Sequence, residues 1–369
     1  KADGAGADAG VFIREGSRIL AYGTDGFPGG TISARSKRGR VVLGPDCLLD
    51  VSAGSQGDAG RLILYAPEEG VDLVGHVRGT GADAGRGGSF SLTTDVISVT
   101  DDSIDDPLEE TVPTENEADG LVAEANPLTL LNAKLVEGGL DRIIEIVTRE
   151  GDIDVTDMMT ARKLKLVAGG GSINVSGRLN ASGLGDPSGA GEGGEVSLYA
   201  YENIDILDNP ELEDGYAEID VAGSGINGAG GRAMISAGHL DDDGNPVGTV
   251  TLHESATIAM GGSGDAAEGG TAHFRALRSA DNTDMALQLL GTVAGAGEVI
   301  AEGVGIYRFQ GAYEIATADL DTAEAAGWYA EAETFAEHMA EFEEPRFPTE
   351  EWESEVQVLA GIEIRTYDV

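Results

Sequence analysis

The chain has 369 residues, and 66 Asp and Glu against 23 Lys and Arg give it a formal net charge of −43. A field of this sign repels phosphates, so we expect no nucleic-acid partner. The charge balance is typical of acidic, halophilic surfaces, and such a density of carboxylates attracts divalent cations loosely. The single cysteine, Cys47, excludes an intrachain disulfide, and no apolar run approaches the ~20 residues of a transmembrane helix.

A glycine-rich turn followed by a short alternating strand recurs along the chain. It occupies Gly23–Ala34, Gly54–Ala66, Gly79–Leu92, Val167–Gly177, Gly189–Ala200, Gly225–Gly238 and Gly262–Ala276. Period-two alternation is typical of a half-buried strand, and degenerate repeats of a few tens of residues indicate a solenoid. The sequence therefore predicts an all-β parallel β-helix over residues 1–316, with coils built as strand, turn, strand and glycine-rich bend.

Two segments interrupt this pattern. Residues 94–126 hold eleven acidic residues and no Lys or Arg, which predicts an acidic loop that leaves the coil. Residues 317–355 carry apolar side chains at helical spacing, namely Trp328, Ala332, Phe335, Met339 and Phe342. This stripe predicts an acidic amphipathic helical insertion packed on the β-helix, or alternatively a docking helix for a partner. Residues 356–369 return to the coil pattern, and we expect the chain to be a fragment of a longer protein.

The best candidate for a metal site is the segment LDDDGNPVG, with Asp241, Asp243 and Asn245 as possible calcium ligands. A calcium loop of the EF-hand type needs glycine at its sixth position and a glutamate at its twelfth, whereas here Pro246 stands at the sixth position and no glutamate stands at the twelfth. A plain acidic turn is the alternative. His253 and His273 are twenty residues apart and could be neighbours on adjacent coils, as weak metal contacts or as solvated surface residues.

Function stays open at this point between three classes. A structural fibre is one, because an uncapped coil exposes ladder edges that favour continuation. A carbohydrate-active β-helix enzyme, a polysaccharide lyase or hydrolase, is another; its carboxylates would come from strand residues such as Asp205, Glu218 and Asp220, although nothing singles these out. A cation-binding acidic sheath is the third. No catalytic residue and no cofactor beyond loosely bound calcium is predicted.

Several phrases together resemble the central repeat region of a known family. In chain order they are GHVRGTGADAGRGGSFSL, LLNAKLVEGGLDRIIEIVTREGDIDV, GSINVSGRLNASG, GTVAGAGEVIAEGVGIY and VQVLAGIEIRT. They resemble the large filamentous-haemagglutinin-like exoproteins of Gram-negative bacteria. The resemblance implies a right-handed β-helix that is secreted by two-partner secretion through an outer-membrane β-barrel partner and displayed at the cell surface as an adhesin or extracellular filament. Neighbouring coils, copies of the same protein and host or cell-surface glycans are the partners it implies.

Overall fold

A computed structural model describes residues 2–24, 26–82, 85–99, 126–183, 191–207, 218–264, 267–310, 323–340 and 356–367. The chain is mostly β-structure and divides into two compact units, residues 1–149 and 150–369, which we describe separately. Most of the predicted acidic loop at 94–126 lies outside the described residues.

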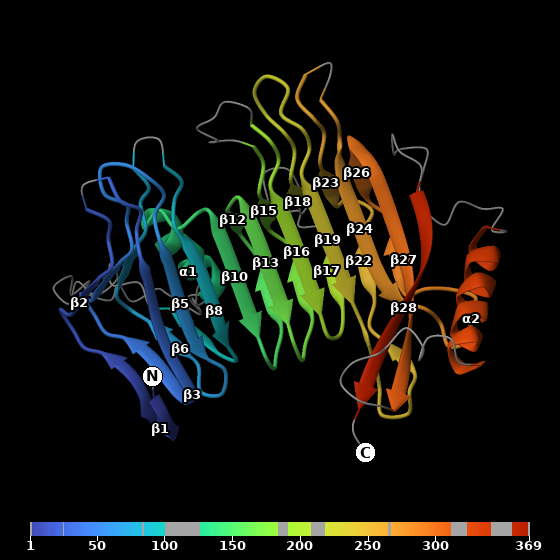
Figure 1. The fold of residues 1–369 in the computed structure, drawn as a ribbon, viewed down its shortest axis with the longest axis horizontal. Helices are drawn as coiled ribbons and strands as arrows, with labels where there is room; N and C mark the ends of the chain where they lie inside the picture. Colours follow the sequence, from blue (N-terminus) through green and yellow to red (C-terminus); the bar gives the residue numbers. More distant parts are fainter. Residues whose placement is uncertain are drawn as a thin grey trace, which may run out of the picture. The chain divides into compact units, whose positions relative to one another are not determined.

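In the second unit the strands form three parallel sheets (Figure 1). The first holds β13 (Lys163–Ala168), β16 (Glu195–Ala200), β19 (Arg232–Ala237), β24 (Gly270–Leu277), β27 (Ala296–Gln310) and β28 (Val356–Tyr367). The second holds β11 (Ile153–Val155), β14 (Ile173–Val175), β17 (Ile204–Ile206), β22 (Val250–Leu252) and β25 (Leu287–Leu289). The third holds β12 (Met158–Thr160), β15 (Arg178–Asn180), β18 (Glu218–Asp220), β23 (Thr257–Ala259) and β26 (Thr292–Ala294).

The chain visits these three sheets in turn, so one coil contributes one strand to each sheet and each strand pairs with its equivalent in the next coil. This order is compatible with the predicted all-β parallel solenoid. It differs from the sequence prediction in having three strands per coil rather than two. The additional strand arises because Ser176 and Gly177 bend the chain between β14 and β15 after only three residues.

The first unit follows a similar plan, but its strand β3 is long enough to pair in two ladders. One sheet has the order β10 (Ile143–Thr148), β8 (Ser89–Thr94), β5 (Arg61–Ala66), β3 (Thr31–Leu43), and β1 (Ala2–Ile13) also pairs with β3. The end of β3 pairs with β6 (Val71–Leu73), which pairs with β9 (Ile97–Val99). A third ladder consists of β2 (Arg18–Leu20), β4 (Leu48–Asp50) and β7 (His76–Arg78).

Register between coils places equivalent apolar side chains directly above one another. In the first sheet of the second unit, one such column contains Leu166, Leu198, Ile235, Phe274 and Ala301, each fully buried. Because side chains of a strand alternate between its two faces, the column fills the interior while the residues between its members face outward. The stacked columns are the hydrophobic core.

The glycine-rich bends are required where coils approach most closely. A Cβ atom at Gly193 would lie 2.0 Å from the carbonyl oxygen of Val221, and one at Gly230 would lie 2.0 Å from that of Met260. These contacts accompany backbone hydrogen bonds that close the bends, such as the one from the Gly231 amide to the Val221 carbonyl oxygen at 2.7 Å. Glycine permits this close backbone approach.

Two helices lie among the described residues. Helix α1 (Pro127–Glu137), which the sequence analysis did not predict, packs on β7 and β9 and buries Leu128, Leu131 and Leu135. Helix α2 (Ala323–Ala340) falls within the predicted insertion at 317–355 and lies beside β28 (Figure 1). It buries four of the five predicted stripe residues, while the fifth, Phe342, lies outside the described residues. In the part of the chain that the structure describes, neither helix is long and apolar enough to cross a bilayer.

The inward columns should dominate stability. Leu164 in β13 is 1% exposed, and Leu164→Ala is expected to lower the free energy of unfolding by about 2–5 kcal/mol because it removes packing and leaves a cavity. The neighbouring Lys163→Ala breaks only an exposed ion pair to Glu195 and should cost under about 1 kcal/mol. Urea unfolding of both variants checks this. Equal losses for the two would contradict the assigned strand orientation.

Candidate functional site

The predicted calcium residues lie on a small antiparallel hairpin formed by β20 (His239–Leu240) and β21 (Pro246–Val247). Asp241 Oδ1 accepts hydrogen bonds from the backbone amides of Asn245 at 2.7 Å and Asp243 at 3.0 Å, and the Asn245 Nδ2 group donates to Asp241 Oδ2 at 3.2 Å. The hydrogen bonds from Asn245 lower the pKa of Asp241, whose side chain is partly exposed. The structure therefore brings Asp241 and Asn245 together, and Asp243 joins them through its backbone.

In this hairpin the carboxylate of Asp241 stabilises the turn by receiving donors from its own chain. Within the described ranges, no group of three or more His, Cys, Asp or Glu side chains is arranged to hold a metal ion. Calcium binding by Asp241, Asp243 and Asn245 stays a prediction.

The two histidines do not lie together. His253 follows β22 of the second sheet, and its Nε2 atom is 3.7 Å from Asp205 Oδ1. His273 lies in β24 of the first sheet, and its Nε2 atom is 2.9 Å from Glu302 Oε2. Each histidine therefore has a carboxylate from a neighbouring strand of its own sheet.

The three strand acids considered for glycoside chemistry have separate partners. Glu218 forms an ion pair with Arg178 in β15. Asp220 Oδ1 accepts a hydrogen bond from the Ala222 amide at 2.9 Å, and Asp205 faces His253. Glu218 and Asp220 belong to the third sheet and Asp205 to the second, so the structure gives no indication of a shared catalytic groove for them.

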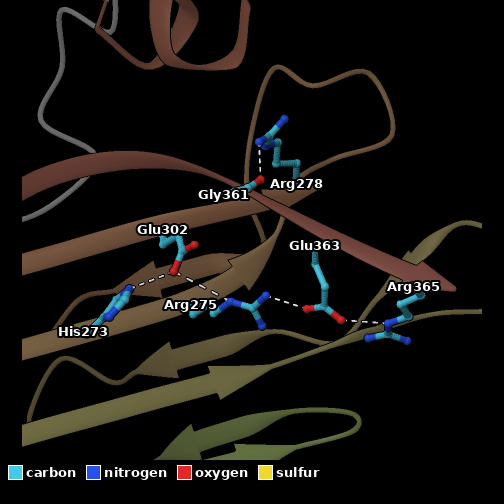
Figure 2. A network of polar contacts seen from close by, with 7 residues as sticks. All are labelled: His273, Arg275, Arg278, Glu302, Gly361, Glu363 and Arg365. Carbon is cyan, nitrogen blue, oxygen red and sulfur yellow. Dashed lines mark hydrogen bonds and ion pairs between the residues drawn. The ribbon is translucent and has the colours of Figure 1, made fainter. Parts of the chain in front are cut away.

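A polar cluster crosses the last three strands of the first sheet, and Figure 2 shows it. We call it the β24–β28 cluster; its members are His273, Arg275, Glu302, Glu363 and Arg365. Glu302 accepts from His273 and lies 3.7 Å from Arg275, whose Nη2 donates to Glu363 Oε2 at 2.5 Å. Glu363 Oε1 then accepts from Arg365 Nε at 2.8 Å. Acidic and basic groups alternate along the cluster and tie β24, β27 and β28 together.

The cluster changes the proton affinity of both glutamates. The hydrogen bond from His273 lowers the pKa of Glu302, and the charge of Arg275 adds to this effect while partial burial opposes it. For Glu363, burial acts to raise the pKa, but hydrogen bonds from Arg275 and Arg365 outweigh it, and the net pKa is lowered. Both glutamates are therefore held in the charged form.

Arg278 lies next to this cluster and is 3% exposed. Its Nε donates to the Gly303 carbonyl oxygen of β27 at 2.9 Å, and its Nη2 donates to the Gly361 carbonyl oxygen of β28 (Figure 2). The guanidinium carbon is also 5.0 Å from the centre of the Phe335 ring in α2. Burial lowers the pKa of Arg278, although its ordinary value is so high that it remains a cation. This one side chain therefore contacts β27, β28 and α2.

Helix α2 is fixed further by Tyr307 of β27. The Tyr307 hydroxyl donates to Glu331 Oε2 at 2.7 Å, and its ring stacks on Trp328 at 5.1 Å between centroids. Burial and the bond to Glu331 raise the pKa of Tyr307 to about 12, so the phenol keeps its proton. Phe335 packs where Gly303 leaves space, because a Cβ there would lie 2.3 Å from the Phe335 ring.

An open hollow of about 120 Å³ lies between the β20–β21 hairpin, the turn at 279–282, β27 and α2. Arg278, Tyr307 and Glu331 are among its lining residues. Pockets that enclose a drug-sized ligand measure about 300–1,000 Å³, so this hollow has room for a few waters or a single small polar group. The contacts of Arg278 and Tyr307, which line this hollow, connect β27, β28 and α2.

Of the five members of the β24–β28 cluster, sequence analysis singled out only His273. The register pairs Arg275 with Glu302, so the signal was the opposite charges at equivalent outward positions of successive coils. This pattern becomes visible only when the coils are aligned with one another, and for β28 the residues inserted after β27 obscure that alignment.

No protein-family model, no curated protein and no solved structure matches this chain. The structure thus supplies the evidence for function beyond the resemblance of its repeats.

The lowered pKa of Glu302 predicts an acid-dependent loss of stability. A carboxyl whose pKa is depressed by folding stabilises the protein above its unfolded pKa of about 4.3, and this contribution is lost as the pH falls through the folded value. Glu302→Gln should therefore reduce the fall in the unfolding midpoint between about pH 5 and 3. Glu298→Gln, on the same strand outside the cluster, is the control and should match the wild type. If the unfolding midpoint of Glu302→Gln falls with pH as steeply as that of the wild type, Glu302 is not the source of the acid-dependent loss.

Arg278 is expected to hold α2 and β28 in place. Arg278→Met keeps much of the apolar stem but leaves the Gly303 and Gly361 carbonyls without a charged donor, and each such bond is worth about 1.5–3 kcal/mol. Amide hydrogen exchange should then quicken in α2 and β28 while β13 and β16 stay protected. Arg365→Met, which breaks a more exposed pair, serves as the control. Unchanged hydrogen exchange in α2 would show that the contacts of Arg278 are not needed to hold the helix.

Proposed function

We propose that this chain is a structural and adhesive segment of a very large secreted cell-surface protein, in which stacked coils build an elongated fibre or matrix component. The observation that carries the proposal is the register-matched stack, in which each strand pairs in parallel with its equivalent in the next coil. A fold of this kind gains length by adding coils and leaves its outward faces free for contacts.

Handedness is part of the same proposal. Crossovers that join parallel strands of one sheet are right-handed in about 98% of cases, because a right-twisted strand packs back onto the sheet that way. The chain leaves the first sheet, passes through the second and third, and re-enters the first beside the previous strand. We therefore propose a right-handed β-helix, in line with the resemblance of its repeats.

The acidic surface fits an extracellular role in which hydration and like-charge repulsion keep a long fibre soluble. The resemblance supplies the remaining elements of the proposal: export through an outer-membrane β-barrel partner and contacts with surface glycans. The separate partners of Asp205, Glu218 and Asp220 favour this reading over a carbohydrate-active enzyme.

Surface display is directly testable. An antibody raised against residues 1–369 should label the outside of intact source cells by immunogold electron microscopy, and external protease should remove the label. A cytoplasmic marker protein, which should stay unlabelled until the cells are broken, controls for lysis. Labelling confined to the cell interior would overturn the proposal.

A further inference from the structure

The hollow between the β20–β21 hairpin, the turn at 279–282, β27 and α2 contains a buried cation whose donors are not all used. Arg278 is 3% exposed, and its Nε and Nη2 atoms donate to the carbonyl oxygens of Gly303 and Gly361 (Figure 2). Its third nitrogen, Nη1, is buried and has no hydrogen-bond acceptor among the described residues. Native structures rarely leave a buried donor in this state, because it has lost its water without gaining a partner. Since Arg278 lines the hollow, an acceptor bound there can reach Nη1.

The charge of Arg278 is as poorly matched as its third nitrogen. Both of its hydrogen-bond acceptors are neutral carbonyl groups. Burial opposes the charge of the guanidinium, and Tyr307 and Glu331 only partly offset this effect. The Tyr307 hydroxyl gives its proton to Glu331, and neither group meets Nη1 in hydrogen-bonding geometry. Buried charges in proteins are normally paired, and an anion in the hollow provides the countercharge and the acceptor together.

Asn282 adds donors to the same hollow. It lies in the turn after β24 with a left-handed backbone (φ 56°), a conformation that Asn adopts more readily than most residues. Its backbone amide donates to the Ser279 carbonyl oxygen at 2.9 Å, which leaves the side-chain amide as its contribution to the hollow. That amide carries two N–H donors. The Ser279 hydroxyl is already used, because it donates to Asp281 Oδ1 at 2.7 Å.

The size and charge of the hollow restrict the ligand. Because Nε and Nη2 of Arg278 are occupied, the guanidinium offers Nη1 alone and cannot form the two parallel bonds by which arginine grips a carboxylate or a phosphate. The volume of about 120 Å³ has room for a single small group. Glu331 also lines the hollow and repels anions, most strongly those with two charges. The arrangement therefore selects a small anion of one charge.

We infer that this hollow is a binding site for a small monovalent anion such as chloride, held by Nη1 of Arg278 and the side-chain amide of Asn282. The bound anion supplies the missing countercharge beside the guanidinium that connects β27, β28 and α2. Its binding therefore strengthens the attachment of the helix to the sheet. The inference goes beyond the proposed structural function and does not depend on surface display.

Chlorine NMR of NaCl solutions tests the inference directly. The wild-type chain should broaden the chloride line, and the excess width should saturate with chloride. Sodium formate should remove it by competition, whereas sodium gluconate, whose anion is too large for the hollow, should not. Asn282→Asp should weaken chloride binding about tenfold, because it replaces an amide donor by a negative charge. Asn227→Asp is the matched control: Asn227 also has a left-handed backbone (φ 63°) but is exposed in another loop, and this variant should bind like the wild type.

A second variant shifts the affinity in the opposite direction. Glu331→Gln removes the repelling charge while its amide oxygen can still accept from Tyr307, so chloride binding should tighten about tenfold. Amide hydrogen exchange in α2 of the wild type should also be slower in NaCl than in sodium gluconate of equal ionic strength. Circular dichroism and unfolding midpoints confirm that each variant is folded.

Two results would overturn the anion site. A wild-type chain without saturable broadening of the chloride line would show that the hollow holds only water. Equal chloride affinities of the wild type, Asn282→Asp and Glu331→Gln would show that chloride binds elsewhere on the chain.

Discussion

Parallel register between successive coils is the constraint on which the other features depend. It holds equivalent residues of neighbouring strands at the ~4.8 Å spacing of a β-ladder, so an inward apolar residue such as Leu198 meets Leu166 below and Ile235 above. The same spacing forces the bends so close together that Gly193 and Gly230 have no room for a side chain. On the outer face it places opposite charges such as Lys163 and Glu195 within 2.8 Å. The stacked core, the glycine bends and the surface ion pairs therefore all follow from the spacing between successive coils.

The second unit departs from this repeat at its last strands, where the chain inserts α2 between β27 and β28. Among the described residues, the second and third sheets end at β25 and β26, and side-chain contacts of another kind join the last strands. Arg278 bridges the carbonyls of β27 and β28, Tyr307 stacks on Trp328, and alternating charges join His273 to Arg365.

Local pattern predicted the strands, the parallel stacking and the helix at 317–355, because alternation and helical spacing are properties of short windows. It missed α1 although the signals were present: Asn126 caps the helix, Pro127 begins it, and Leu128, Leu131 and Leu135 lie on one face. The sequence analysis expected two strands per coil instead of three because the short strands follow one another so closely: only Ser176 and Gly177 separate β14 from β15. The β24–β28 cluster depends on register between segments far apart in the sequence, and a local pattern contains no information about that register.

The β20–β21 hairpin shows how freely the corners of a coil vary. Residues 169–172 connect β13 to β14, whereas residues 238–249, which include the hairpin, connect the equivalent strands β19 and β22. Despite this difference, Val250 still pairs with Ile204 as Ile204 pairs with Ile173. Corner length is thus uncoupled from the ladder: a longer corner leaves the pairing of the strands unchanged, and it blurs the repeat period in the sequence. A foreign peptide grafted into this corner would likewise be carried on the outside of an undisturbed scaffold.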